Sequence, residues 1–239
     1  MGPFVASLAV LVLLLCASCA QPDVERTPQE AEPSASAPVD RAPSSTSAPR
    51  IVFLGDSLTA GYGLDKDASV PSLIQKRLKD GGYPYEVVNA GVSGDTSAGG
   101  LSRLEWSLAG DVKILVIELG ANDGLRGLPV AGLKQNLTEI ITRARARGIS
   151  VILTGMEAPP NFGPAYTSEF REVYRQLAKE RDVTFVPFYL EGVAGIPHLN
   201  IADGIHPNAE GSRIVEKTVW SALEPLLAKQ AAGRKNPGR

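Results

Sequence analysis

The sequence predicts an α/β protein with one three-layer domain, in which helices cover both faces of a parallel β-sheet. The first observation is a set of five short runs rich in branched aliphatic residues, as in strands that are buried on both faces. The second is that segments with apolar residues at helical spacing separate these runs. Alternating strands and helices imply right-handed crossovers and parallel pairing. The third is length, since about 180 residues after Pro49 suit a single domain.

The five strands are predicted at residues 51–54, 87–89, 112–117, 151–154 and 184–186. Apolar stripes predict helices over residues 70–78, 101–108, 130–141 and 166–177. A last helix is predicted from about Asn208 to Pro225, because a proline inside a helix removes one hydrogen bond and clashes with the preceding turn.

Charge and composition exclude several classes of protein. The 239 residues include 24 Lys and Arg against 26 Asp and Glu, so there is no basic surplus for nucleic acid, which is not an expected partner. The only two cysteines, Cys16 and Cys19, lie in the first twenty residues, so the folded part has neither a disulfide framework nor a cysteine metal site. Only His198 and His206 could supply an imidazole, and His198 is interpreted as a loop residue.

The N-terminal segment is interpreted as an export signal. Residues 4–18 are uncharged and almost wholly apolar, and about fifteen residues are shorter than the roughly 20 that span a bilayer. Ala17 and Ser18 precede Cys19 in a pattern that resembles a bacterial lipobox, whose cysteine is lipidated and becomes the first residue of the mature chain. We therefore predict a signal peptide at 1–19 and a lipoprotein anchored to the membrane, in the periplasm or cell envelope. The alternatives are cleavage after Ala20, which gives a secreted or periplasmic protein, and an uncleaved anchor.

Residues 20–49 are predicted to be a disordered tether. They hold six Pro, six Ala and five Ser and no aromatic residue, so they cannot bury enough apolar surface to offset the entropy lost on ordering. A folded domain is then predicted at 50–228, and a flexible tail at 229–239.

Polar loops follow the predicted strands at residues 55–59, 90–96 and 120–124, and a fourth, 203–207, precedes the last helix. In an open parallel sheet, ligands bind beyond the carboxyl ends of the strands. We therefore expect these four loops to converge on one edge of the sheet and to carry the functional site.

Ser57, Asp203 and His206 are the residues in these loops that could form a catalytic triad. A serine at a strand-to-helix turn exposes its hydroxyl, but it needs an adjacent base. Asp203 and His206 are three positions apart, so the carboxylate can orient the imidazole toward the serine. The alternatives for this pair are a surface histidine capped by a carboxylate, or two metal ligands.

Gly94 and Asn122 could complete the site. A glycine N–H and an asparagine amide, beside the N–H of Ser57, would make a three-donor oxyanion hole. The alternative for both residues is an ordinary loop turn. Three further acidic residues are expected to brace these loops as acceptors: Asp56, Asp95 and Asp123.

The four loops, taken in order, resemble the four sequence blocks of the SGNH (GDSL) hydrolase family. They read Gly-Asp-Ser-Leu at 55–58, Gly-Asp-Thr at 94–96, Gly-Ala-Asn-Asp at 120–123 and Asp-Gly-Ile-His-Pro at 203–207. The resemblance extends over residues 50–227 and is strongest to bacterial esterases that act on aryl esters, acyl-CoA and lysophospholipids. It implies a five-stranded sheet in flavodoxin-like order and a monomer that needs no cofactor.

By the same resemblance Ser57 is the nucleophile, Asp203 and His206 complete the triad, and Gly94 and Asn122 are oxyanion donors. The predicted function is therefore a serine esterase of small acyl esters, possibly including thioesters and lysophospholipids. Because a histidine base must be neutral, activity is expected to rise with pH near ~6.5, the value of an unperturbed histidine. Loops 124–131 and 158–166 are expected to shape the acyl groove. The alternatives are an O-acetylesterase of cell-envelope polysaccharide and a non-catalytic envelope protein that binds a ligand.

Overall fold

The computed structural model describes residues 48–235. The predicted signal peptide, Cys19 and residues 20–47 of the predicted tether lie outside the described residues, as do residues 236–239. The fold is a five-stranded parallel sheet in the order β2-β1-β3-β4-β5, which confirms the predicted flavodoxin-like order. Its strands are β1 (Arg50–Gly55), β2 (Glu86–Gly91), β3 (Val112–Glu118), β4 (Ser150–Thr154) and β5 (Thr184–Val186). All five predicted strands are present, with ends that differ by two residues at most.

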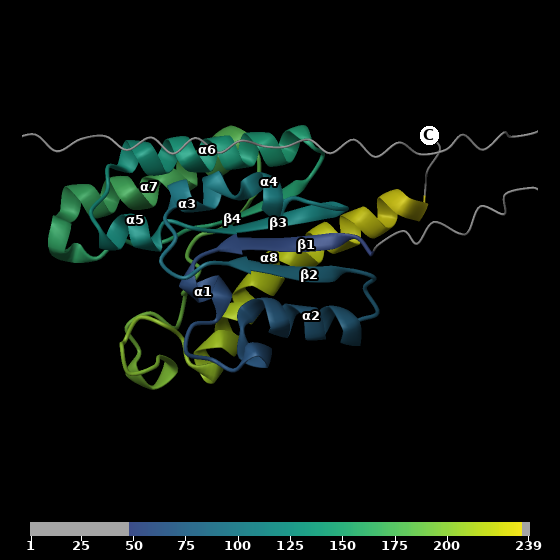
Figure 1. Ribbon diagram of the computed structural model, residues 1–239, viewed down its shortest axis with the longest axis horizontal. Coiled ribbons are helices and arrows are strands. Elements are labelled where there is room, and N and C mark those ends of the chain that lie inside the picture. The colour runs from purple at the N-terminus through teal and green to yellow at the C-terminus, as the bar shows by residue number, and fades with distance from the viewer. Residues whose placement is uncertain (1–47, 236–239) are drawn as a thin grey trace, which may run out of the picture. The chain divides into compact units, whose positions relative to one another are not determined.

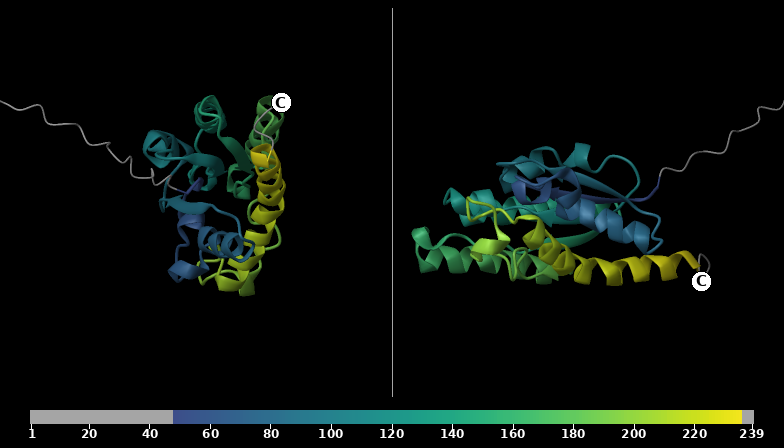
Figure 2. Two further views of the ribbon diagram at one scale, coloured as in Figure 1. Left: turned by 90° about the vertical axis from the view of Figure 1, so that its right-hand side faces the viewer. Right: turned by 90° about the horizontal axis from the view of Figure 1, so that it is seen from below.

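Helices cover both faces of the sheet, as predicted. One face is covered by α2 (Val70–Asp80) and α8 (Ala209–Lys235), and the other by α3 (Ser97–Ser102), α4 (Leu104–Ser107), α6 (Val130–Ala146) and α7 (Pro164–Arg181) (Figure 1). Figure 2 shows these two helix layers end-on, on opposite sides of the sheet. Short elements occupy the connections: α1 (Ser57–Ala60), α5 (Ala121–Leu125), and the 3₁₀ turns η1 (Lys66–Ala68), η2 (Pro160–Phe162) and η3 (Pro197–Leu199). No helix within residues 48–235 is long and apolar enough to cross a membrane.

The core lies between the two helix layers and is densest around the central strands. Residues 51–54 of β1 and 114–117 of β3 are fully buried. Burying one aliphatic side chain of this size is worth about 1.5–3 kcal/mol. This burial on both faces explains why these strands show no alternation of polar and apolar residues.

The prediction that the last helix ends at Pro225 is wrong. Helix α8 continues through this proline to Lys235, so the predicted flexible tail is helical from 229 to 235. Leu223 and Leu227, on either side of the proline, are fully buried, whereas Pro225 itself is exposed. The carbonyl that loses its partner on this face can bind water, and the burial of the flanking leucines offsets a proline penalty of about 3 kcal/mol.

The carboxyl ends of the central strands bring three of the predicted loops together. Gly55 of β1 lies level with Gly91 of β2 on one side and with Glu118 of β3 on the other. Helix α1 begins almost at once after β1 and folds back over the strand end. A side chain at position 55 would lie 2.0 Å from Oγ1 of Thr59, so only glycine allows this tight turn. The turn places Ser57, the first residue of α1, just beyond the carboxyl end of β1, whereas Arg50 begins the strand. Figure 1 shows α1 at this end of the strand.

Candidate active site

Ser57 is the first residue of helix α1, on the turn that leaves β1. Asp56 caps this helix, and its Oδ1 accepts a hydrogen bond from the N–H of Leu58 at 3.0 Å. After one turn Gly61 adopts a left-handed conformation and ends the helix. The Ser57 side chain is therefore held at the tip of a short, capped turn.

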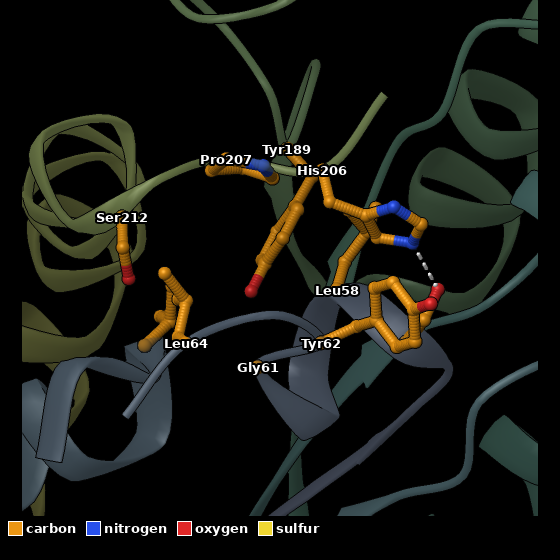
Figure 3. A pocket seen from close by; sticks show the side chains of 10 residues that line it. Leu58, Gly61, Tyr62, Leu64, Tyr189, His206, Pro207 and Ser212 are labelled. Atoms are coloured by element: carbon orange, nitrogen blue, oxygen red, sulfur yellow. Dashed lines mark hydrogen bonds between the residues drawn. The ribbon is translucent and has the colours of Figure 1, made fainter. Parts of the chain in front are cut away.

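The structure brings Ser57, His206 and Asp203 into one hydrogen-bonded chain. His206 Nε2 lies 2.8 Å from Ser57 Oγ, across 149 positions of sequence, and His206 Nδ1 lies 2.6 Å from Asp203 Oδ2. Figure 3 shows the imidazole and its bond to the serine at the mouth of a small pocket. The three residues that the sequence predicts as a triad therefore lie in the geometry that a triad requires.

Hydrogen bonds keep Asp203 ionised. Its Oδ1 accepts from the backbone N–H groups of Ile205 at 2.9 Å and His206 at 3.0 Å. These bonds, with a smaller contribution from the imidazole, lower the pKa of Asp203 from 3.8 to about 2. An ionised Asp203 accepts a hydrogen bond from Nδ1–H, which leaves Nε2 unprotonated and able to take the hydroxyl proton of Ser57.

Tyr62 packs against the imidazole on the solvent side. The two ring centroids are 4.8 Å apart with the planes tilted by 43°, although the Tyr62 side chain is 54% exposed (Figure 3). Sequence reasoning missed this residue, because nothing in the spacing of Tyr62 indicated a partner 144 positions away. His198, by contrast, lies on the 3₁₀ turn η3, where its carbonyl accepts from the Asn208 amide, in agreement with its interpretation as a loop residue.

The expected oxyanion donors Gly94 and Asn122 lie on the segments that follow β2 and β3, and Asn122 lines the same cavity as Ser57. Gly94 has φ +85°, a left-handed conformation that favours glycine, and no acceptor from residues 48–235 binds its N–H or that of Ser57. Asn122, at the start of α5, donates its amide hydrogens to the carbonyl of Asp95 at 2.9 Å and to Asp56 Oδ2 at 3.2 Å. Because an amide has only two such hydrogens, Asn122 must exchange one of these bonds before it can bind an oxyanion.

Two carboxyl groups, Asp56 and Glu118, are fully buried behind the nucleophile turn. Glu118 Oε2 accepts from Thr59 Oγ1 at 2.8 Å and from the Asp56 N–H at 3.3 Å, whereas Oε1 has no hydrogen-bond partner in the described part of the chain. Desolvation raises the pKa of Asp56 from 3.8 to about 6. Desolvation, and then the nearby charge of Asp56, raise the pKa of Glu118 well above 4.5. The sequence signal for this pair is Glu118, an acidic residue directly after the apolar run 112–117. Sequence reasoning assigned no role to Glu118.

The three loop aspartates act as acceptors, as predicted. Asp56 caps α1, and Asp95 Oδ2 accepts from Arg103 Nε at 2.6 Å. Asp123 accepts from the backbone N–H and the hydroxyl of Ser97, at 2.8 and 2.6 Å. The bonds of Asp123 thereby connect the segments that follow β2 and β3. No group of three or more His, Cys, Asp or Glu residues within 48–235 is arranged to hold a metal ion.

A cavity of about 520 Å³ opens beside the triad and leads away from it. Ser57, Asn122 and His206 form its polar end. The rest of its wall is mostly apolar and includes Leu125, Met156, Ala158, Pro159, Pro160, Phe188, Leu190 and Ile205. Segments 124–131 and 158–166 both contribute to this wall, as expected. The cavity matches a ligand with an apolar chain and one polar end.

Taken together, the site has the parts that acyl transfer requires: a hydroxyl hydrogen-bonded to an imidazole, a carboxylate that orients the imidazole, and free N–H groups beside the hydroxyl. The profile of the GDSL-like Lipase/Acylhydrolase family matches residues 53–214. The chain belongs to this family. It is therefore an enzyme, a hydrolase of carboxylic esters.

Known relatives of this GDSL hydrolase agree with that assignment. The chain is 49% identical to the esterase TesA of Pseudomonas aeruginosa over 178 residues, which are 74% of this chain and 89% of the relative. It is 36% identical, also over 178 residues, to thioesterase 1/protease 1/lysophospholipase L1 of Escherichia coli K12, covering 74% of this chain and 84% of the relative. Among solved structures, the psychrotrophic esterase EstA of Pseudoalteromonas sp., inhibited by monoethylphosphonate, has a TM-score of 0.71 and 32% identity, over 75% of this chain and 98% of EstA.

Proposed function

We propose that this GDSL hydrolase cleaves esters through an acyl-enzyme formed on Ser57. The observation that carries the proposal is the pair of contacts of His206, at 2.8 Å to the Ser57 hydroxyl and 2.6 Å to Asp203. Ser57 Oγ attacks the acyl carbon while His206 Nε2 takes the hydroxyl proton and then passes it to the departing alcohol or thiol. Water then attacks the acyl-enzyme, with His206 again as the base, and releases the acid and the free serine.

The charge that develops on the carbonyl oxygen would be held by the N–H groups of Ser57 and Gly94. No acceptor within residues 48–235 binds either N–H group. Asn122 would become the third donor by giving up its bond to Asp56, which at 3.2 Å is the longer of its two. One such donor contributes about 3 kcal/mol to the transition state.

Most of the wall of the apolar cavity beside Ser57 is aliphatic or aromatic, which favours binding of an acyl chain there. The proposed substrates are aryl esters, acyl thioesters and lysophospholipids. The relatives named as an esterase and as a thioesterase/lysophospholipase support this range. An O-acetylesterase of envelope polysaccharide would instead prefer acetylated sugars. A substrate panel of acetyl-sugar esters and longer aryl esters separates the two.

The test of the chemistry is the substitution Ser57→Ala. The variant should fold normally but lose turnover of a p-nitrophenyl ester, and it should no longer be labelled by a fluorophosphonate probe. Wild-type turnover by a folded Ser57→Ala variant would refute the proposed mechanism.

We also propose that the enzyme is a membrane-anchored lipoprotein of the cell envelope. The sequence around Cys19 supports lipidation. An anchor before the domain is compatible with an open site, because Arg50 is the first residue of β1 and Ser57 follows the opposite end of this strand. Metabolic labelling with a palmitate analogue should mark the full chain and not the Cys19→Ala variant. Equal labelling of both chains, or labelling of neither, would contradict the proposal.

A further inference from the structure

Arg103 lies where the predicted helix over 101–108 is broken into two. It follows α3 and precedes α4, on the face of the sheet that α6 also covers (Figure 1). Its side chain is only 17% exposed, although its neighbour Trp106 is largely in solvent. A buried guanidinium requires partners for its charge and its N–H groups.

Three different segments of the active site supply those partners. Arg103 Nη2 donates to the carbonyl of Gly55 at 2.8 Å, and Nη1 donates to the carbonyl of Ala90 at 2.6 Å. These carbonyls belong to the ends of the paired strands β1 and β2. Arg103 Nε donates to Asp95 Oδ2 at 2.6 Å, and the side chain of Asp95 is only 20% exposed.

Two of these contacts, with Gly55 and Asp95, lie next to groups of the proposed oxyanion hole. Gly55 is two residues before Ser57, and Asp95 directly follows Gly94. The carbonyl of Asp95 also accepts the amide of Asn122 at 2.9 Å. One guanidinium therefore connects the backbone near all three proposed donors.

We propose that Arg103 is the positioning residue that holds the oxyanion hole of this enzyme in register, an inference that rests on the proposed function. Arg103 does not face the substrate cavity, whose wall it does not join. It acts through Gly55 and Asp95, by keeping the loop after β2 at a constant distance from the nucleophile turn after β1. Displacement of a reacting group by about 1 Å is enough to lower a rate about 100-fold.

The geometry requires an arginine and not only a positive charge. The three N–H groups of Arg103 point along different edges of one rigid plane, toward Gly55, Ala90 and Asp95. A lysine ammonium could pair with Asp95 but could not reach both carbonyls in the same plane. Arg103→Lys is therefore the conservative variant. It keeps the positive charge but removes the planar set of three hydrogen bonds.

The experiment measures kcat and KM for a p-nitrophenyl ester with wild type, Arg103→Ala and Arg103→Lys. The matched control is Arg77→Ala, which removes a guanidinium that pairs with Glu216 at 3.1 Å and stacks on Trp220, on the α2 and α8 face. We expect Arg103→Ala to lose about 100-fold in kcat with KM within about threefold, because misplaced donors weaken the transition state and not substrate binding. Arg103→Lys should remain at least about 10-fold below wild type, and Arg77→Ala should keep its kcat.

Three results would overturn the inference: kcat within about threefold of wild type in Arg103→Ala, a loss confined to KM, or an equal loss of kcat in Arg77→Ala. If Arg103→Ala does not fold, Arg103→Lys replaces it in the test, and a kcat of Arg103→Lys within about threefold of wild type would overturn the inference. Failure of the proposed function would look different, because the wild-type enzyme itself would then neither turn over the ester nor react with the fluorophosphonate.

Discussion

The buried carboxyl pair behind the nucleophile should make the enzyme less stable at alkaline pH than at mildly acidic pH. Burial raises the pKa of Asp56 from 3.8 to about 6, and that of Glu118 well above 4.5. A carboxyl whose pKa is higher in the folded state binds more protons there than in the unfolded chain. The free energy of unfolding therefore falls as pH rises from 3.8 to about 6 for Asp56, and over a higher range for Glu118.

The size of the effect follows from the same values. A rise in the pKa of Asp56 from 3.8 to about 6 corresponds to about 3 kcal/mol of stability lost by pH 7. Replacing Glu118 with Gln removes one ionisable group and the repulsion between the two. The glutamine side chain keeps an oxygen that can accept the hydrogen bond from Thr59 Oγ1, which in the wild type lies 2.8 Å from Glu118 Oε2. Because burial raises the pKa of Glu118 well above 4.5, we expect Glu118→Gln to have a higher free energy of unfolding than wild type near pH 8, and little difference near pH 4.5.

Urea denaturation of both proteins at the two pH values measures this difference. The matched control is Glu216→Gln, because Glu216 is also buried but pairs with Arg77 at 3.1 Å. Removing that charge should lower stability near pH 8, the opposite sign from Glu118→Gln. The reasoning fails if Glu118→Gln is no more stable than wild type near pH 8, or if the gain is equally large near pH 4.5.

Three further predictions concern the oxyanion hole, the triad and the last helix. Asn122→Ala should lower kcat about 100- to 1000-fold with little change in KM; near-wild-type kcat in steady-state assays would exclude Asn122 as a donor. Because the pKa of Asp203 is lowered to about 2, its carboxylate stabilises the folded state fully above pH 3.8 and loses this effect only as pH falls toward about 2. Asp203→Asn should thus lower kcat by roughly 10³- to 10⁴-fold at every pH of a rate profile, and a loss confined to acid pH would contradict the orienting role. Pro225→Ala should raise Tm by several degrees in calorimetry, because the exposed proline interrupts the bonds of a helix that continues to Lys235; an unchanged or lower Tm would show that the proline costs this helix nothing.

Much of the fold could be predicted because its information is local. Runs such as 112–117 and stripes such as 130–141 reveal a strand or a helix from the spacing of a few neighbouring residues. The location of Ser57 in a loop after a strand, and the short separation of Asp203 from His206, are equally local, so the candidate triad could be named in advance. The error at Pro225 arose because a local rule was applied where burial of Leu223 and Leu227 decides the outcome.

The sequence by itself therefore determined the elements, the loops and the residue types that could do chemistry. Only the tertiary structure decided that the amide of Asn122 is occupied by Asp56 and Asp95, and that Glu118 is buried against Asp56. It also decided that Arg103 connects the end of β1 with the end of β2 and the loop after it. These contacts join residues up to 66 positions apart. They depend on the order and register of the strands, which the burial of all segments together establishes and which no single segment encodes.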